Sequence, residues 1–325
     1  MYSLTNDIFK YQVRLKKINK MQDNTNIKGG LFIALGMLLL AIADNYIRFV
    51  TETIGLWQFH LSRSLIAIPI LIFAVMLQGG RIFPQHFKLV FLRTLLMVFA
   101  MLIYFGCLAF FPISQVAAGL FTSPIFVIIF SILLLRENVY ISRVFAVLIG
   151  SLGTFLALSL NFYDFSILSL FPITAGVFYA LASITTRLWC REEDARSLMF
   201  MFFFGIGFVS FIMIFLIELN QVFQLYSLPN TFITSPLQTY SLNDLAIIFM
   251  HALLSVIGGI LITLGYQKGI TSFVAVFEYS FLFFVTFWAY LLFSDQISMS
   301  MLLGMSLIIL SGLVISNSKD RNKMH

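Results

Sequence analysis

Charged residues are scarce in this chain of 325 residues. Asp, Glu, Lys and Arg together make up 10% of it, whereas 60% of the residues are hydrophobic. A soluble domain carries roughly a quarter charged residues. The chain has too few charges to cover a water-facing surface of ordinary size, so we predict that lipid surrounds most of it.

Cysteines and catalytic motifs are equally scarce. Cys107 and Cys190 have no CxxC spacing, which argues against a disulfide framework or a zinc site and favours buried thiols. The sequence has no P-loop, G-x-S-x-G or H-E-x-x-H pattern. We therefore expect no enzymatic activity, no cofactor, no metal and no ATP-driven step. The basic residues lie in tails and loops, as membrane topology requires, so they do not indicate nucleic-acid binding.

Long apolar segments dominate what is present. A helix needs about 20 apolar residues to cross the hydrocarbon core of a bilayer. Ten segments qualify, near Gly29–Val50, Trp57–Leu77, Lys88–Phe110, Ile113–Leu135, Ile141–Leu160, Phe165–Thr186, Ser197–Leu216, Leu245–Gln267, Thr271–Phe293 and Ser298–Ser316. The predicted fold is an all-α membrane protein with ten transmembrane helices.

Lys and Arg alternate between the connections of these segments. Every second connection carries basic residues, and the others carry none, not even the long connection 218–243. Because basic loops stay in the cytoplasm, the alternation favours ten spans with both ends inside. Residues 1–28 are polar and basic, without an apolar core of signal-peptide type, and are expected to form a cytoplasmic tail. Residues 317–325 are expected to form a second one.

An internal repeat divides the chain. The stretch LIYFGCLAFFPISQVAAGLF from Leu102 resembles LITLGYQKGITSFVAVFEYSF from Leu261, and Gly106 and Gly153 match Gly265 and Gly312 at one offset. We therefore predict two five-helix repeats, 29–160 and 165–316. Because each has an odd number of helices, the second is inverted relative to the first. Inverted repeats recur in secondary transporters, where two equivalent halves exchange inward-open and outward-open shapes.

The repeat also carries a family resemblance. A tight turn, Thr122-Ser123-Pro124, an apolar run, Leu135-Arg136-Glu137 and a glycine-rich helix follow one another in the first half, and SFVAVFEYSFLFFVTFWAYLLFSD followed by LLGMSLIILSGLVI matches in the second. The pattern resembles the EamA domain of the drug/metabolite transporter superfamily. The second half has Glu278-Tyr279 and lacks the proline that many members carry near Phe283. This variant is similar to a branch with S-adenosylmethionine and riboflavin-type carriers.

The resemblance implies a ten-helix carrier with a central cavity, in a bacterial inner membrane. Glu278 is the first candidate in this cavity, because charges within a membrane face the bundle interior or water. It would bind a cationic group or exchange a proton, or alternatively pair with a neighbouring helix, with Tyr279 beside it in the cavity or in packing. Further candidates for substrate contact are Tyr104, Asn45, Tyr179, His251 and Ser123, with structural roles as the alternative for each.

Four residues are expected to act in gating or structure. Asp44 and Arg48 lie one turn apart, which favours a local ion pair. Arg63 would pair with Asp44 or Glu52, or close an outer gate. Pro124, with Ser123, interrupts its helix and frees a backbone carbonyl, as is common at transport sites.

The predicted function is secondary transport of a small organic metabolite by alternating access. An amino acid or an S-adenosylmethionine-like solute is favoured, with proton coupling or exchange as the energy source. The alternatives are a non-transporting membrane scaffold or sensor and an intramembrane enzyme, the latter disfavoured because the intramembrane charges are isolated. Import or export and the oligomeric state stay open.

Overall fold

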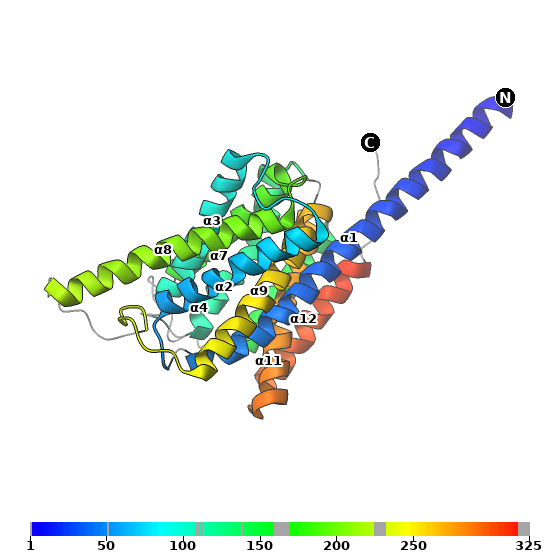
Figure 1. Cartoon of the computed structure of the whole chain (residues 1–325). Coiled ribbons are helices and arrows are strands. Elements are labelled where there is room, and N and C mark those ends of the chain that lie inside the picture. The colour runs from blue at the N-terminus through cyan, green and yellow to red at the C-terminus, as the bar shows by residue number, and fades with distance from the viewer. Residues whose placement is uncertain are drawn as a thin grey trace.

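The computed structural model describes residues 2–50, 52–107, 111, 113–137, 139–158, 170–223 and 232–317. Within these ranges the regular structure is entirely helical (Figure 1). The helices are α1 (Tyr2–Val50), α2 (Leu56–Gln78), α3 (Phe87–Cys107), α4 (Ile113–Leu120), α5 (Ser123–Leu133), α6 (Ile141–Ala157), α7 (Phe171–Trp189), α8 (Ala195–Phe223), α9 (Leu242–Lys268), α10 (Thr271–Val274), the 3-10 helix η3 (Ala275–Tyr279), α11 (Ser280–Phe293) and α12 (Met299–Asn317).

Eight stretches of the described chain are long and apolar enough to cross a membrane. They are Asn24–Val50, Leu56–Gln78, Phe87–Cys107, Gln115–Leu133, Ala195–Gln221, Leu242–Lys268, Thr271–Phe293 and Met299–Asn317. The other two predicted spans coincide with helices α6 and α7, but α6 has only 17 residues and α7 is not among the eight. The chain is thus a multi-pass membrane protein, and the count of ten spans stays a prediction.

Two helices extend well beyond their predicted segments. Helix α1 begins at Tyr2, so it continues through the segment expected to be a tail and extends beyond the bundle (Figure 1). Helix α8 runs to Phe223, which shortens the connection expected at 218–243. The N-terminal end of α1 and the C-terminal end of α12 lie toward one side of the bundle (Figure 1), called here the tail side, and the C-terminal end of α1 lies toward the far side.

Two of the membrane-spanning stretches are interrupted. Helix α4 ends at Leu120 and α5 begins at Ser123, with Pro124 in its first turn. Because proline has no backbone N–H and clashes with the preceding turn, it is suited to begin a helix and not to continue one. This confirms the predicted interruption. The stretch 271–293 is divided as well, into α10, η3 and α11, although its sequence contains no proline.

The helices pack in related pairs from the two halves of the chain. Helix α1 lies against α9 and α11, while α7 lies against α3 and against α4 and α5. Helix α2 packs on α8, and α6 packs on α12. When each of the first five predicted spans is exchanged for its counterpart among the last five, the contacts of α1 with α9 and α11 become those of α7 with α3 and with α4 and α5. The α2–α8 and α6–α12 pairs are unchanged by this exchange.

Candidate transport cavity

A cavity of about 220 Å³ lies in the interior of the bundle. Its walls come from α1, α2, α3, the α4–α5 and α10–α11 stretches, α7, α8 and α9. The apolar lining is rich in methionine and aromatic side chains, which adapt to flat or irregular apolar groups. The polar lining residues are Asp44, Arg63, Arg93, Tyr104, Ser123, Tyr179, His251, Ser255, Thr263 and Glu278.

Glu278 lies in η3 and is buried. The Ser123 hydroxyl donates to Oε2 at 3.1 Å, and the Tyr266 hydroxyl donates to Oε1 at 2.6 Å. Tyr179 on α7 lines the same cavity. The two hydroxyl donors come from α5 and α9, so one carboxyl group in η3 links three elements. In the described part of the chain, neutral hydroxyls and no ion-pair partner surround it.

The far-side end of the cavity holds a second polar group. Nε2 of His251 lies 3.1 Å from Asp44 Oδ1, and Nδ1 of the same ring lies 3.0 Å from the Ser255 hydroxyl. His251 is almost fully buried, whereas 41% of the Asp44 side chain is exposed. The Asp44 side chain is therefore partly exposed at the cavity, and the imidazole joins it to α9.

Arginines line both ends of the cavity. Arg63 lies on α2, with its guanidinium carbon 5.6 Å from the centre of the Phe59 ring and 5.5 Å from that of Phe203. Arg93 lies on α3, and its Nε donates to Thr186 Oγ1 at 2.8 Å. Both side chains are buried. They give the cavity fixed positive charge beside the carboxyl groups.

Two predicted contact residues lie outside the cavity lining. The hydroxyl of Tyr279 lies 2.8 Å from Ser151 Oγ, and its ring packs close to Gly150 on α6. The Asn45 side-chain amide donates to the carbonyls of Ala41 and Val285 and so holds α1 against α11. In the described structure both side chains have packing contacts away from the cavity.

The ion pairs expected for Asp44, Arg48 and Arg63 were wrong. Arg48 pairs with Asp295 at 3.2 Å, and its guanidinium lies 3.7 Å from the centre of the Phe293 ring. Asp44 pairs with His251 instead. Arg63 has no carboxylate within ion-pair distance in the described chain and lies between two aromatic rings. Spacing along one helix cannot reveal partners that other helices supply.

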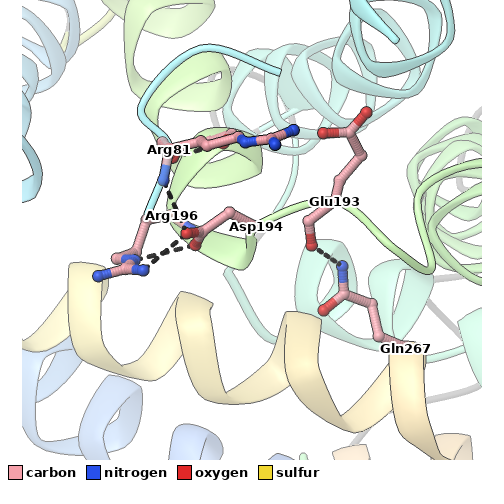
Figure 2. Close-up of polar contacts among 6 residues, drawn as sticks. Arg81, Glu193, Asp194, Arg196 and Gln267 are labelled. Atoms are coloured by element: carbon pink, nitrogen blue, oxygen red, sulfur yellow. Dashed lines mark hydrogen bonds and ion pairs between the residues drawn. The ribbon is translucent and has the colours of Figure 1, made fainter. Parts of the chain in front are cut away.

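Polar contacts close the bundle on the tail side. The α7–α8 connection bonds to the segment before α3 and to the end of α9. Figure 2 shows Asp194 accepting from the Arg81 backbone and the Arg196 side chain, and Gln267 donating to the Glu193 carbonyl. Nearby, Ser272 donates to Glu137 at 2.9 Å and accepts from Arg143 at 2.7 Å.

Glu193 receives its hydrogen bonds from the start of α3. The backbone N–H groups of Gln85 and His86 donate to its two oxygens at 2.9 and 2.7 Å, and the His86 ring lies 3.1 Å from Oε1. Burial by itself would raise the pKa of Glu193, but these bonds outweigh it, and the net shift lowers the pKa. Burial would likewise raise the pKa of Asp194, and its bonds from Arg196 and Arg81 lower it overall.

Beyond this closure lies a surface hollow of about 450 Å³. Glu137, Arg187 and Glu193 contribute to its walls. Arg187 also donates to the Gln267 carbonyl at 2.6 Å, and its neighbour Thr186 bonds to Arg93 in the cavity. One layer of polar contacts thus separates the cavity from the surface hollow on the tail side.

Sequence reasoning missed several residues of the cavity region, among them Arg93, Ser255 and Thr263 in its lining and Tyr266 beside Glu278. Arg93 follows Lys88 by five residues in an apolar run, so it resembles a charge at the membrane boundary. Tyr266, the partner of Glu278 at 2.6 Å, lies on α9, on the other side of a tight turn. The signal that could have identified Arg93 is its position inside the apolar segment, where a charge usually faces the interior of the bundle. No comparable signal marked Tyr266.

Comparison with known proteins identifies relatives that are named as transporters or exporters. Residues 27–159 match the EamA-like transporter family. The chain is 29% identical over 177 residues to a riboflavin transporter of Vibrio cholerae and 30% identical over 146 residues to one of Brucella anthropi. These matches cover 53% and 45% of this chain but only 59% and 50% of the two relatives' lengths.

Two further similarities extend over most of the chain. A pseudopaline exporter of Pseudomonas aeruginosa is 21% identical over 296 residues, which cover 90% of this chain and 98% of the exporter. A solved crystal structure superposes with a TM-score of 0.70 over 88% of this chain and 95% of its own, at 14% identity. At that identity the superposition establishes a shared fold.

Proposed function

We propose, from the premise that residues 27–159 form an EamA-like transporter domain, that this chain is a secondary transporter of a small organic metabolite. It moves the solute through the central cavity by alternating access. The relatives named as transporters support solute transport across a membrane as the general activity. The cavity supports the more specific part of the proposal.

The observation that carries this proposal is an interior cavity of an apolar bundle whose lining includes charged side chains. Buried charges in a membrane protein are costly and tend to line solute or ion pathways. Here two carboxyl groups and two guanidinium groups face one cavity, on elements from both halves of the chain. A structural scaffold would have no need of two carboxyl and two guanidinium groups around an interior space.

The accessibility of the two ends supports alternating access. Asp44 keeps 41% of its side chain exposed at the far-side end, while polar contacts around Gln267, Ser272 and Glu193 close the tail side. Opening this closure would connect the cavity with the hollow of about 450 Å³. In the proposed cycle, in which the two sides open in turn, this arrangement would be the state with the tail side closed.

The interrupted helices and the related packing pairs also support this mechanism. Discontinuous helices at a repeat interface commonly surround transport sites. In this chain the interruptions fall in the fourth predicted span of each five-span half, at Thr122 and at η3. Helix contacts that correspond between the halves are what rocking between inward-open and outward-open shapes would require, because each half would take the other's arrangement in turn.

The cavity volume favours small solutes such as amino acids. Sites for drug-sized ligands span roughly 300–1,000 Å³, and this cavity of about 220 Å³ lies below that range. The methionine and aromatic lining suits an apolar or aromatic body, while the charged groups suit polar ends. Glu278 and Asp44 are the proposed contacts for a cationic group or a coupled proton.

Uptake of a defined metabolite mixture by proteoliposomes tests the proposal. The full chain should accumulate at least one small organic solute with saturable kinetics, as measured by mass spectrometry of the vesicle contents. A Glu278→Gln variant of equal folding and orientation should lose most of that flux. If no solute shows saturable uptake, the non-transporting scaffold or sensor becomes the better interpretation. If the variant retains wild-type flux, transport stands but the proposed role of Glu278 does not.

A further inference from the structure

Two buried arginines in the cavity have unused hydrogen-bond donors. Arg63 is 7% exposed and Arg93 is 4% exposed, and both line the cavity. Nε of Arg63 and Nη1 of Arg93 are buried atoms without a hydrogen-bond partner among the described residues. A guanidinium presents five N–H donors in a rigid fork and stays charged in proteins. Leaving such donors unsatisfied in the interior costs free energy.

Neither arginine has an acidic partner in the described part of the chain. Asp44 pairs with His251, and Glu278 receives hydroxyl hydrogen bonds. Arg63 is in contact with aromatic rings, and Arg93 bonds to a neutral threonine. Because an uncompensated buried charge is strongly destabilising, each guanidinium favours an anion within hydrogen-bond distance, which the described residues do not supply.

We infer that Arg63 and Arg93 bind the acidic group of the transported solute, which is therefore a small organic acid. The inference rests on the proposed transport function and specifies its substrate class. A carboxylate matches the guanidinium fork in two parallel hydrogen bonds. The apolar body of the acid then lies against the methionine and aromatic lining, and any amino group faces Asp44 or Glu278.

The positions of the two arginines along the membrane normal determine the sequence in which an entering solute would meet them. Arg63 lies seven residues from the start of α2 on the far side, and Arg93 lies six residues from the start of α3 on the tail side. At about 1.5 Å per residue, each is roughly 10 Å from its own end of the bundle. An acid entering from the Asp44 end meets Arg63 first, and Arg93 receives it next to the tail-side closure.

Chemical modification of the solubilised full chain tests this inference without a transport assay. Phenylglyoxal reacts with accessible guanidinium groups, and peptide mass spectrometry reports the modification rate at each arginine. Benzoate, benzamide and benzylamine serve as probes, because they share one ring and differ in charge. We expect Arg63 to react, and benzoate to slow its modification at least about fivefold while the other two probes leave it unchanged. Exposed Arg81 is the internal control and should show no protection.

Thermal unfolding provides a second measurement. Benzoate should raise the melting temperature of the wild type more than benzamide does, and Arg63→Gln and Arg93→Gln should each reduce that difference. Arg48→Gln, which alters the exposed pair with Asp295, should keep it. The inference would be overturned if benzylamine protected Arg63 as well as benzoate does. It would also be overturned if benzoate neither protected Arg63 nor raised the melting temperature more than benzamide. Benzoate protection without solute flux would instead contradict only the proposed function.

Discussion

The hydroxyl of Ser123 donates a hydrogen bond of 3.1 Å to Glu278, and this contact joins the two interrupted stretches of the bundle. Ser123 is the first residue of α5, and Glu278 lies in η3. Interrupted helices expose backbone groups that need partners, and in membranes they occur where protein or a cavity surrounds them. The polar centre of the cavity thus lies at the junction of the two halves.

Removing the Ser123 hydroxyl should impair transport more than folding. In Ser123→Ala, Glu278 loses one of its hydrogen bonds, and the fixed orientation of its carboxyl group relaxes. We expect flux to fall about threefold to tenfold, with a loss of unfolding free energy of about 1 kcal/mol. Proteoliposome uptake and thermal unfolding in detergent measure the two effects.

Ser131→Ala is the matched control for this prediction. Ser131 is also buried on α5, but its hydroxyl has no hydrogen-bond partner among the described residues. Its removal should change neither flux nor stability appreciably. If both variants lower flux equally, α5 tolerates no change, and the Ser123–Glu278 contact has no special role.

Acid should loosen the tail-side closure through Glu193. A carboxyl group whose pKa is lowered in the folded state stabilises that state at any pH above its unfolded value of about 4.3. The stabilisation declines as the pH falls below that value and is gone once the pH has dropped through the lowered folded pKa. Hydrogen exchange at the backbone amides of Gln85 and His86 should therefore accelerate as the pH falls below about 4, after correction for the intrinsic rate.

Glu193→Gln should produce this loosening at neutral pH. An amide group would present its NH₂ to one of the backbone donors, with an expected cost of about 1–3 kcal/mol. Glu192→Gln is the control, because 91% of the Glu192 side chain is exposed and its distance to Arg191 is 4.0 Å. Equal exchange in the two variants at pH 7 would show that the Glu193 contacts do not hold the closure.

Close contact between α6 and α12 should make Gly304 intolerant of a methyl group. A Cβ at Gly304 would lie 2.5 Å from the Ala157 nitrogen and 2.6 Å from the Gly153 carbonyl oxygen, both backbone atoms. Small residues allow such approach between membrane helices. We expect Gly304→Ala to lower the free energy of unfolding by about 1–3 kcal/mol, measured by thermal or denaturant unfolding in detergent.

Gly312→Ala on the same helix provides the comparison. A Cβ at Gly312 would meet no described atom within 4 Å, so the expected change is close to zero. Equal destabilisation by the two substitutions would point to a helix-wide effect and not to the α6–α12 contact.

The Arg48–Asp295 pair should contribute little. Its side chains are 41% and 47% exposed, and exposed ion pairs contribute about 0–1 kcal/mol. Asp295→Asn should change the unfolding free energy by less than about 1 kcal/mol and the flux by less than about twofold. A larger loss of flux with unchanged stability would assign this pair a gating role.

The sequence predicted the helical segments well and their contacts poorly. Hydrophobic length locates each segment, and Pro124 marks the interruption before α5 because it cannot continue a helix. The second interruption, at η3, has no such marker, since Ala275–Tyr279 is an apolar stretch whose conformation depends on packing. Periodicity along one segment contains no information on that packing.

The sequence likewise predicted which polar side chains face the interior of the bundle better than it predicted their partners. Glu278, Tyr104, Tyr179, Ser123 and His251 were expected in the cavity and line it, because polar groups in apolar segments must face the interior. Tyr279 and Asn45 meet that criterion equally well and bond instead to Ser151 and to backbone carbonyls. Which interior space a polar residue faces depends on helix rotation, and one sequence leaves that rotation undetermined. The binding roles of all these residues stay predictions.

Trans-stimulation in proteoliposomes is the most direct test of a carrier that works through this cavity. Vesicles are loaded with the solute identified from the metabolite mixture, and uptake of the isotope-labelled solute is compared with uptake into empty vesicles. Alternating access predicts saturable uptake that internal solute accelerates severalfold, and a loss of that acceleration in Glu278→Gln. Uptake that rises linearly with concentration, or that internal solute leaves unchanged in wild type and variant alike, would contradict it.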